Sequence, residues 1–133
     1  MSSVITDTHT LVWYILEPEQ LSTTALNALE DTTTDGEVIY LSAISIVEIC
    51  YLTDKGRLSE TVLSRVMGAI ASGNSVLEVV PVDLEVSLAI QQIDRNTVPD
   101  MPDRIIAATA LYLNLPLVTR DSKIQSSTIQ TIW

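Results

Sequence analysis

The chain has 133 residues, the length of a single domain, and we expect one domain over residues 1–133. Hydrophobic residues make up 47% of the chain and charged residues 18%, which excludes an intrinsically disordered protein. Seven Lys and Arg residues stand against 17 Asp and Glu residues, and the net charge of −10 excludes a general polyanion binder. Any work on nucleic acid must therefore depend on local basic groups and on a cation.

The cysteine and histidine counts exclude two kinds of site. Cys50 is the only cysteine and His9 the only histidine, so no disulfide framework and no Cys- or His-rich zinc site can form. The apolar runs are far shorter than the ~18 residues that span a bilayer. The first residues lack the basic and apolar regions of a signal peptide. We therefore expect a cytoplasmic protein without membrane association.

In chain order, short apolar runs that predict strands alternate with segments of helical spacing. Ser22 is a good N-cap for the second helix, and Pro102 suits the first position of the last one. Gly73-Asn74 predicts a turn and 96–102 a loop. The expected elements are strand 4–5, helix 10–16, helix 23–31, strand 38–41, a helix from 42 or 43 to 53, helix 60–71, strand 77–82, helix 84–93, helix 103–113, strand 117–119 and strand 129–133.

This alternation predicts an α/β fold with three layers, α/β/α, around a central and mainly parallel sheet. In such folds, sites form outside the carboxyl ends of the strands. Asp7 and Asp121 directly follow the strands 4–5 and 117–119. Glu48 lies in the helix after strand 38–41, and Asp103 lies in the first turn of helix 103–113. We therefore expect these four carboxylates to share one site.

Each acid also has a simpler interpretation. Asp7 could cap the helix after it, residues 45–48 match a capping box, and Asp121 could be an ordinary turn acid. Asp103 could favour the positive end of its helix, or pair with Asp100 as a cap. Glu48 fits such an interpretation least, because a carboxylate among so many apolar neighbours needs a partner.

Together, the four acids predict a bound cation. Two carboxylates ~4 Å apart repel by roughly 4 kcal/mol at an effective dielectric constant near 20, so four cannot all stay ionised alone. Ligands that are all oxygen select Mg²⁺ or Mn²⁺ over zinc. Such an ion can lower the pKa of bound water and stabilise charge on a phosphoryl group.

Five segments carry a resemblance to a known family. Residues 5–13, with the sequence ITDTHTLVW, resemble the opening of PIN-domain proteins, in particular the VapC-like toxins of bacterial toxin–antitoxin pairs. Four further matches follow in the family's order: LSAISIVEI (41–49), KGRL (55–58), PDRIIAATA (102–110) and LVTRD (117–121). The resemblance covers the whole chain, and five segments in the right order make it specific.

The resemblance implies a PIN-like fold and a Mg²⁺- or Mn²⁺-dependent endoribonuclease that hydrolyses RNA phosphodiester bonds. Thr119 matches a hydroxyl residue beside the last acid. Arg104 and Arg120 are candidates for binding substrate phosphate, although each could instead neutralise a neighbouring carboxylate. The family's catalytic and metal-binding acids map onto Asp7, Glu48, Asp103 and Asp121.

The family also implies a homodimer and a cognate antitoxin protein, with helices 23–31 and 45–53 as candidate contact surfaces. Asp100 matches an acid common in the preceding loop, and its role stays open. The chain departs from the family at Pro102, where many members have an aromatic residue, and in its low basic content.

The histidine, the cysteine and three aromatic residues are expected to have structural roles. We expect His9 to be structural or capping rather than a general base, and Cys50 to be a small core residue. The aromatic residues Trp13, Tyr14 and Tyr51 are expected to pack rather than to stack on bases.

Two other functions compete with the ribonuclease. The first is a PIN-like metal-binding module that acts through protein partners and cleaves nothing. The second is a receiver-type phosphoacceptor domain, which needs an acceptor Asp after the middle strand, where this chain has Ser42.

Overall fold

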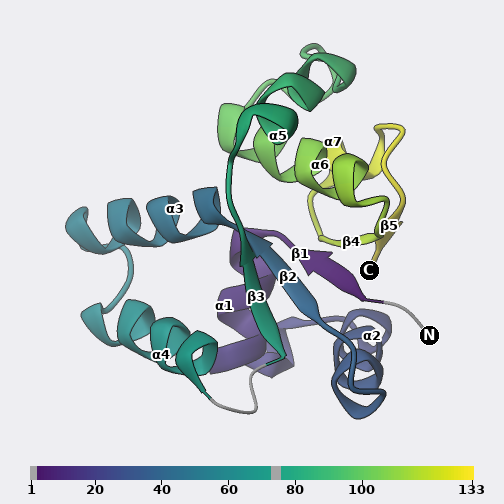
Figure 1. Cartoon of the computed structure of the whole chain (residues 1–133). Coiled ribbons are helices and arrows are strands. Elements are labelled where there is room, and N and C mark those ends of the chain that lie inside the picture. The colour runs from purple at the N-terminus through teal and green to yellow at the C-terminus, as the bar shows by residue number, and fades with distance from the viewer. Residues whose placement is uncertain (1–2, 73–75) are drawn as a thin grey trace.

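The computed structural model describes residues 3–72 and 76–133, and its five strands form one sheet (Figure 1). The strands are β1 (Val4–Thr6), β2 (Ile39–Ser42), β3 (Leu77–Val80), β4 (Leu117–Val118) and β5 (Thr131–Ile132). Their order is β3-β2-β1-β4-β5, and every neighbouring pair is parallel. The chain thus builds outward from β1 on one side and then returns to build on the other.

Within residues 3–72 and 76–133, seven α-helices and two short 3-10 helices surround the sheet (Figure 1). The α-helices are α1 (Thr8–Leu16), α2 (Thr23–Thr34), α3 (Ala43–Asp54), α4 (Glu60–Ala71), α5 (Leu84–Ala89), α6 (Met101–Leu113) and α7 (Ser122–Gln125). The 3-10 helices are η1 (Pro18–Gln20) and η2 (Ile90–Gln92). None of the helices in the described part of the chain is long and apolar enough to cross a membrane.

Two hydrophobic cores lie on opposite faces of the sheet, because successive strand residues point to opposite sides. Val4 and Val118 pack with α1, α2, α3 and α4, whereas Ile5 and Leu117 pack with α5, α6 and α7. The expected α/β/α layering is therefore confirmed, and the sheet is parallel throughout the described residues.

Hydrogen-bonding caps set where several helices begin, and they explain two differences from the expected bounds. α1 begins at Thr8 rather than at residue 10 because the Asp7 side chain accepts from Thr10 N. α6 begins at Met101 because Asp100 accepts from Asp103 N. Ser22 caps α2 as expected.

The other differences have local causes. β3 ends at Val80, because Pro81 has no N–H for the ladder, and the helix expected over 84–93 changes to a 3-10 turn after Ala89. α2 extends to Thr34, and β5 is shorter than residues 129–133. α7 and η1 were not predicted. The turn expected at Gly73-Asn74 lies outside the described residues.

Candidate active site

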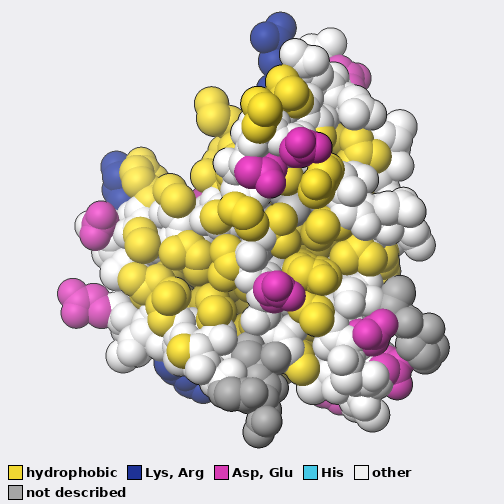
Figure 2. All heavy atoms as spheres, viewed as in Figure 1, with side chains coloured by type: hydrophobic (Ala, Val, Ile, Leu, Met, Phe, Trp, Pro, Cys, Tyr) yellow, Lys and Arg dark blue, Asp and Glu magenta, His cyan; other side chains and the backbone are white. Residues whose placement is uncertain are grey.

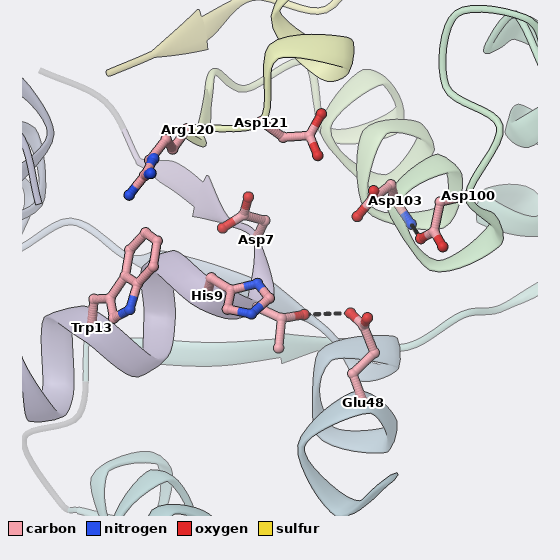
Figure 3. Close-up of a pocket in the computed structure, with 9 residues that line it drawn as sticks. Asp7, His9, Trp13, Glu48, Asp100, Asp103, Arg120 and Asp121 are labelled. Carbon is pink, nitrogen blue, oxygen red and sulfur yellow. Dashed lines mark hydrogen bonds between the residues drawn. The ribbon is translucent and has the colours of Figure 1, made fainter. Parts of the chain in front are cut away.

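A cavity of about 450 Å³ opens where β1 and β4 end (Figure 3). These two strands are adjacent, yet the chain leaves β1 toward β2 and β3 and reaches β4 only later, so the strand order reverses between them. Ligand sites of open α/β sheets form at such a switch point. The lining residues are Asp7, Thr8, His9, Trp13, Glu48, Asp100, Asp103, Arg120 and Asp121.

Asp7 is buried at the centre of this site, directly after β1. Its Oδ1 accepts from Thr10 N at 2.9 Å, and its Oδ2 accepts from the Thr119 hydroxyl at 2.5 Å. Thr119 Oγ1 also accepts from Asp121 N at 3.0 Å. Asp7 therefore acts as a helix cap and as a lining carboxylate at once, and Thr119 connects two of the four predicted acids.

Glu48 reaches the cavity from α3, and its carboxylate has the hydrogen-bond partner expected for an acid among apolar neighbours. The Thr8 hydroxyl lies 2.5 Å from Glu48 Oε1 and 2.9 Å from Ser45 Oγ (Figure 3). Burial raises the pKa of Glu48 above its usual value, and the charges of Asp100 and Asp7 raise it further. The capping box over residues 45–48 was a wrong interpretation, because the N-cap of α3 is Ser42.

Asp103 lies in the first turn of α6 and carries the largest perturbation of the site. Burial, together with the charges of Asp100, Asp121, Glu48 and Asp7, raises the pKa of Asp103 to about 7. Asp100, the N-cap of α6, belongs to the same cavity wall. Burial first, and then the repulsion from its neighbours, thus favours the protonated form of Asp103.

Asp121 reaches the cavity from the loop after β4. Its Oδ1 accepts from Lys123 N and Ile124 N, and so caps the four-residue helix α7. The structure therefore brings together all four acids predicted from the sequence and adds Asp100 to them.

The two predicted arginines have different fates. Arg120 lines the cavity, and its guanidinium lies 5.7 Å from the centre of the Trp13 ring. Arg104 does not line it, because its guanidinium donates to Ile90 O and Ile93 O at 3.3 and 3.4 Å. These contacts connect α6 to η2, and the predicted role of Arg104 in binding substrate phosphate stays a prediction.

The aromatic residues meet the expectation of packing only in part. Trp13 and Tyr14 pack against the core as expected, and Trp13 also lines the cavity, as His9 does. His9 and Trp13 are four residues apart, so they lie on the same face of α1, the helix that Asp7 caps. This spacing could have indicated that both line the cavity. Tyr51 is 57% exposed, so it does not pack as expected. Cys50 is half-buried on α3.

The donor set fits a hydrated divalent cation. The five carboxylates of the cavity offer only oxygen ligands. Several of these oxygens already accept hydrogen bonds from hydroxyl or backbone donors. In the described part of the chain, no three Asp, Glu, His or Cys side chains are close enough to hold one ion directly. Mg²⁺ suits such a site, because it usually takes one or two carboxylates and keeps several waters.

Comparison with known proteins identifies the family. The PIN domain family model matches residues 4–127. The chain belongs to the PIN domain family. Ribonuclease VapC22 of Mycobacterium tuberculosis is 26% identical over 126 residues, which are 95% of this chain and 92% of that protein.

Solved structures share the PIN-domain fold. VapBC2 from Rickettsia felis, bound to a promoter DNA fragment, matches with a TM-score of 0.73 at 19% identity over 97% of this chain and 96% of that one. A toxin–antitoxin complex from Klebsiella pneumoniae matches with a TM-score of 0.66 at 20% identity, over 98% and 96% of the two chains. At these identities the likeness is one of fold.

Proposed function

We propose that this PIN domain is a Mg²⁺- or Mn²⁺-dependent endoribonuclease that hydrolyses RNA phosphodiester bonds, and that it is the toxin of a toxin–antitoxin pair. The observation that carries the proposal is the convergence of four acids from four separate segments on one cavity. The similarity of the chain to ribonuclease VapC22 supports RNA as the substrate. The pKa of Asp103, raised by burial and by neighbouring carboxylates, supports a cation, because a divalent ion would offset both the cost of burying the charge and the repulsion.

Asp7, Glu48, Asp103 and Asp121 are the residues that would hold the ion, in part through water. When bound, the ion lowers the pKa of water and stabilises the charge that develops on the phosphoryl group. The hydroxyls of Thr8 and Thr119 orient Glu48 and Asp7. Arg120 offers a positive group to the phosphate from the other side of the cavity (Figure 3).

The test is cleavage of total RNA by purified chain freed of any partner, in Mg²⁺, Mn²⁺ or EDTA. The key variant is Asp7→Asn, because an amide caps a helix as well as a carboxylate does but carries no charge. Asp31→Asn is the matched control, since Asp31 is exposed on α2 and does not line the cavity. We expect discrete, metal-dependent cuts from the native chain and from Asp31→Asn, and none from Asp7→Asn.

A PIN-like module without nuclease activity is the alternative. It predicts no metal-dependent cuts in any of these samples, together with a melting temperature that still rises with Mg²⁺. Loss of both responses would contradict the metal site itself.

The proposed partners are a second copy of the chain and an antitoxin protein. The solved toxin–antitoxin complexes that share the fold support the antitoxin. Hydrophobic side chains spread over the face that carries α3, β3 and α5 (Figure 2). Val47 and Tyr51 on α3 and Leu84 and Leu88 on α5 are 57–71% exposed, so these two helices present large hydrophobic side chains to solvent.

We name Val47, Tyr51, Leu84 and Leu88 the apolar face and assign it to the second copy. Of the two helices expected to make such contacts, α3 therefore fits. α2 has no exposed large hydrophobic side chain among its described residues, and its role as a contact surface stays a prediction.

A further inference from the structure

Three side chains form a rim on the cavity wall opposite Asp100 and Asp103 (Figure 3). The ring centres of His9 and Trp13 lie 5.7 Å apart, with their planes tilted by 44°. The Arg120 guanidinium lies 5.7 Å from the Trp13 ring centre. The ring centre of Trp133 lies 6.1 Å from that of Trp13. We call His9, Trp13 and Arg120 the rim cluster.

The charge on Arg120 has no ion-pair partner within the described part of the chain. Its side chain is exposed and lines the same cavity as five carboxylates. Yet, among the described residues, its guanidinium makes only the contact with Trp13 and forms neither an ion pair nor a hydrogen bond. Arg104 contrasts with Arg120, since its Nη2 donates to two backbone carbonyls. Arg120 is therefore a free cation beside an aromatic surface.

We propose that the rim cluster is a subsite for one unpaired nucleotide next to the reacting phosphate. This inference rests on the proposed nuclease function. The base packs on the rings of His9 and Trp13, and Arg120 binds the phosphate of that nucleotide. Aromatic and guanidinium groups hold splayed bases of single-stranded RNA in this way. The subsite would select single-stranded segments, because a base within a duplex cannot reach the rings.

The charge of the chain favours stacking as the main source of affinity. The net charge is −10, and Arg120 is the sole Lys or Arg among the described residues that line the cavity. Each phosphate contact to a single strand contributes a slope of about −0.7 in log K against log salt. The proposal therefore predicts a shallow slope, near that of one contact. A basic peptide would be attracted by the five carboxylates of the cavity instead, so an oligolysine peptide is the competing probe in the test.

The test is a fluorescence titration with single-stranded hexamers in Ca²⁺ and, in parallel, in EDTA. The chain has two tryptophans, so Trp133→Phe leaves Trp13 as the only indole reporter. The probes are oligoadenylate as RNA, the same sequence as DNA, an abasic hexamer and an oligolysine peptide. A gel of each sample shows that the RNA stays intact.

Two exposed positions allow truncation without damage to the core. In the Trp133→Phe background, His9→Ala and Arg120→Gln are compared with Lys123→Gln. Lys123 is exposed and outside the cavity lining, and both glutamine variants change the net charge equally. Circular dichroism and the melting temperature confirm that each variant is folded.

We expect quenching by the RNA hexamer, weak or no quenching by the abasic one, and roughly 5- to 100-fold weaker binding in His9→Ala. Arg120→Gln should weaken binding and bring the salt slope near zero, and Lys123→Gln should do neither. Equal binding of DNA would support the subsite as one for single strands of either kind. Quenching by oligolysine alone would overturn the proposal in favour of a protein site.

Equal binding by Arg120→Gln and Lys123→Gln, or equal quenching by the abasic probe, would also overturn it. The outcome is separable from that of the proposed function. Metal-dependent cleavage without base-dependent quenching would leave the nuclease standing and remove the subsite. Base-dependent quenching without cleavage in Mg²⁺ or Mn²⁺ would support the subsite and contradict the nuclease function.

Discussion

Thr119 shows how one hydroxyl can hold an acidic site in shape. The buried Thr119 side chain donates to Asp7 Oδ2 and accepts from Asp121 N, so it fixes two carboxylates that follow neighbouring strands. A hydrogen bond to a charged group contributes about 1.5–3 kcal/mol, and a buried carboxylate oxygen left without its donor costs a similar amount. Thr119 is thus a positioning residue for both acids.

We expect Thr119→Val to lower the free energy of unfolding by about 1.5–3 kcal/mol, because it keeps the shape of the side chain but removes the hydroxyl. Urea denaturation measures this change. Thr119→Ser keeps the hydroxyl and should recover most of the stability and of the metal-dependent cleavage. A valine variant that unfolds at the same urea concentration as the native chain would contradict the role given to this bond.

Asp103 makes stability depend on pH. Its folded-state pKa of about 7 lies above the ordinary 3.8, so the folded state binds the proton more tightly than the unfolded state does. The stability that this provides is fully present below about pH 4 and is lost as the pH rises to about 7. Because the site is open to solvent, we expect only about 1 kcal/mol from this group, or roughly 3–5 °C in Tm.

In EDTA, therefore, the Tm contribution of Asp103 should fall between about pH 4 and pH 7. Asp103→Asn should remove that dependence and raise the metal-free Tm at pH 7.5. Thermal melts across this range test the prediction, with Asp31→Asn as a control that removes one exposed carboxylate from α2. An equal rise in both variants would show a general relief of net charge, not of a local cluster.

At the scale of elements, α1 begins on a residue of the site. Asp7 caps the helix by accepting from Thr10 N, and it also lines the cavity. One side chain therefore has a structural role and a proposed chemical role. Two substitutions separate them. Asp7→Asn removes the charge and keeps the cap, whereas Asp7→Ala removes both.

We expect both variants to lose cleavage. Asp7→Ala should in addition be about 0.5–2 kcal/mol less stable than Asp7→Asn, because it lacks the helix cap. Denaturant unfolding in EDTA measures the difference. Ser22→Ala on α2 provides the comparison for a cap outside the site, since Ser22 accepts from Ala25 N at 3.0 Å. If Asp7→Asn were as unstable as Asp7→Ala, the cap would depend on the charge of Asp7 and the two roles would not separate.

The elements that sequence reasoning identified are those with a strong local signal. The strands before Asp7 and Asp121 could be predicted because a short apolar run ends in a turn acid, and the parallel sheet brings those ends together. The acidic site followed from this topology. α7 could not be predicted, because four residues carry no helical period, and it depends on the cap from Asp121.

The direction of the two arginines could not be predicted either. Arg104 and Arg120 each stand beside a site acid in the sequence, yet they point to different places. Arg104 turns to the carbonyls at the end of η2, a contact set by how α5 and α6 pack. Such tertiary contacts leave no local pattern in the sequence.

For the whole molecule, charge and hydrophobicity act in opposite directions on self-association. Each chain carries a net charge of −10, which opposes the approach of a second copy. The apolar face, formed by Val47, Tyr51, Leu84 and Leu88, favours it. Salt screens the charge and leaves the hydrophobic contact, so a dimer should become tighter as the salt concentration rises.

We expect Tyr51→Glu and Leu84→Glu each to weaken a dimer at least about 100-fold, because a carboxylate buried in an apolar interface without a partner costs several kcal/mol. Light scattering after size exclusion would report the mass of one chain in place of two. Tyr112→Glu is the matched control, since Tyr112 is 49% exposed near the far end of α6. If all three variants dimerise like the native chain, the second copy binds elsewhere, and if the native chain is monomeric at high salt, the apolar face is free for the antitoxin.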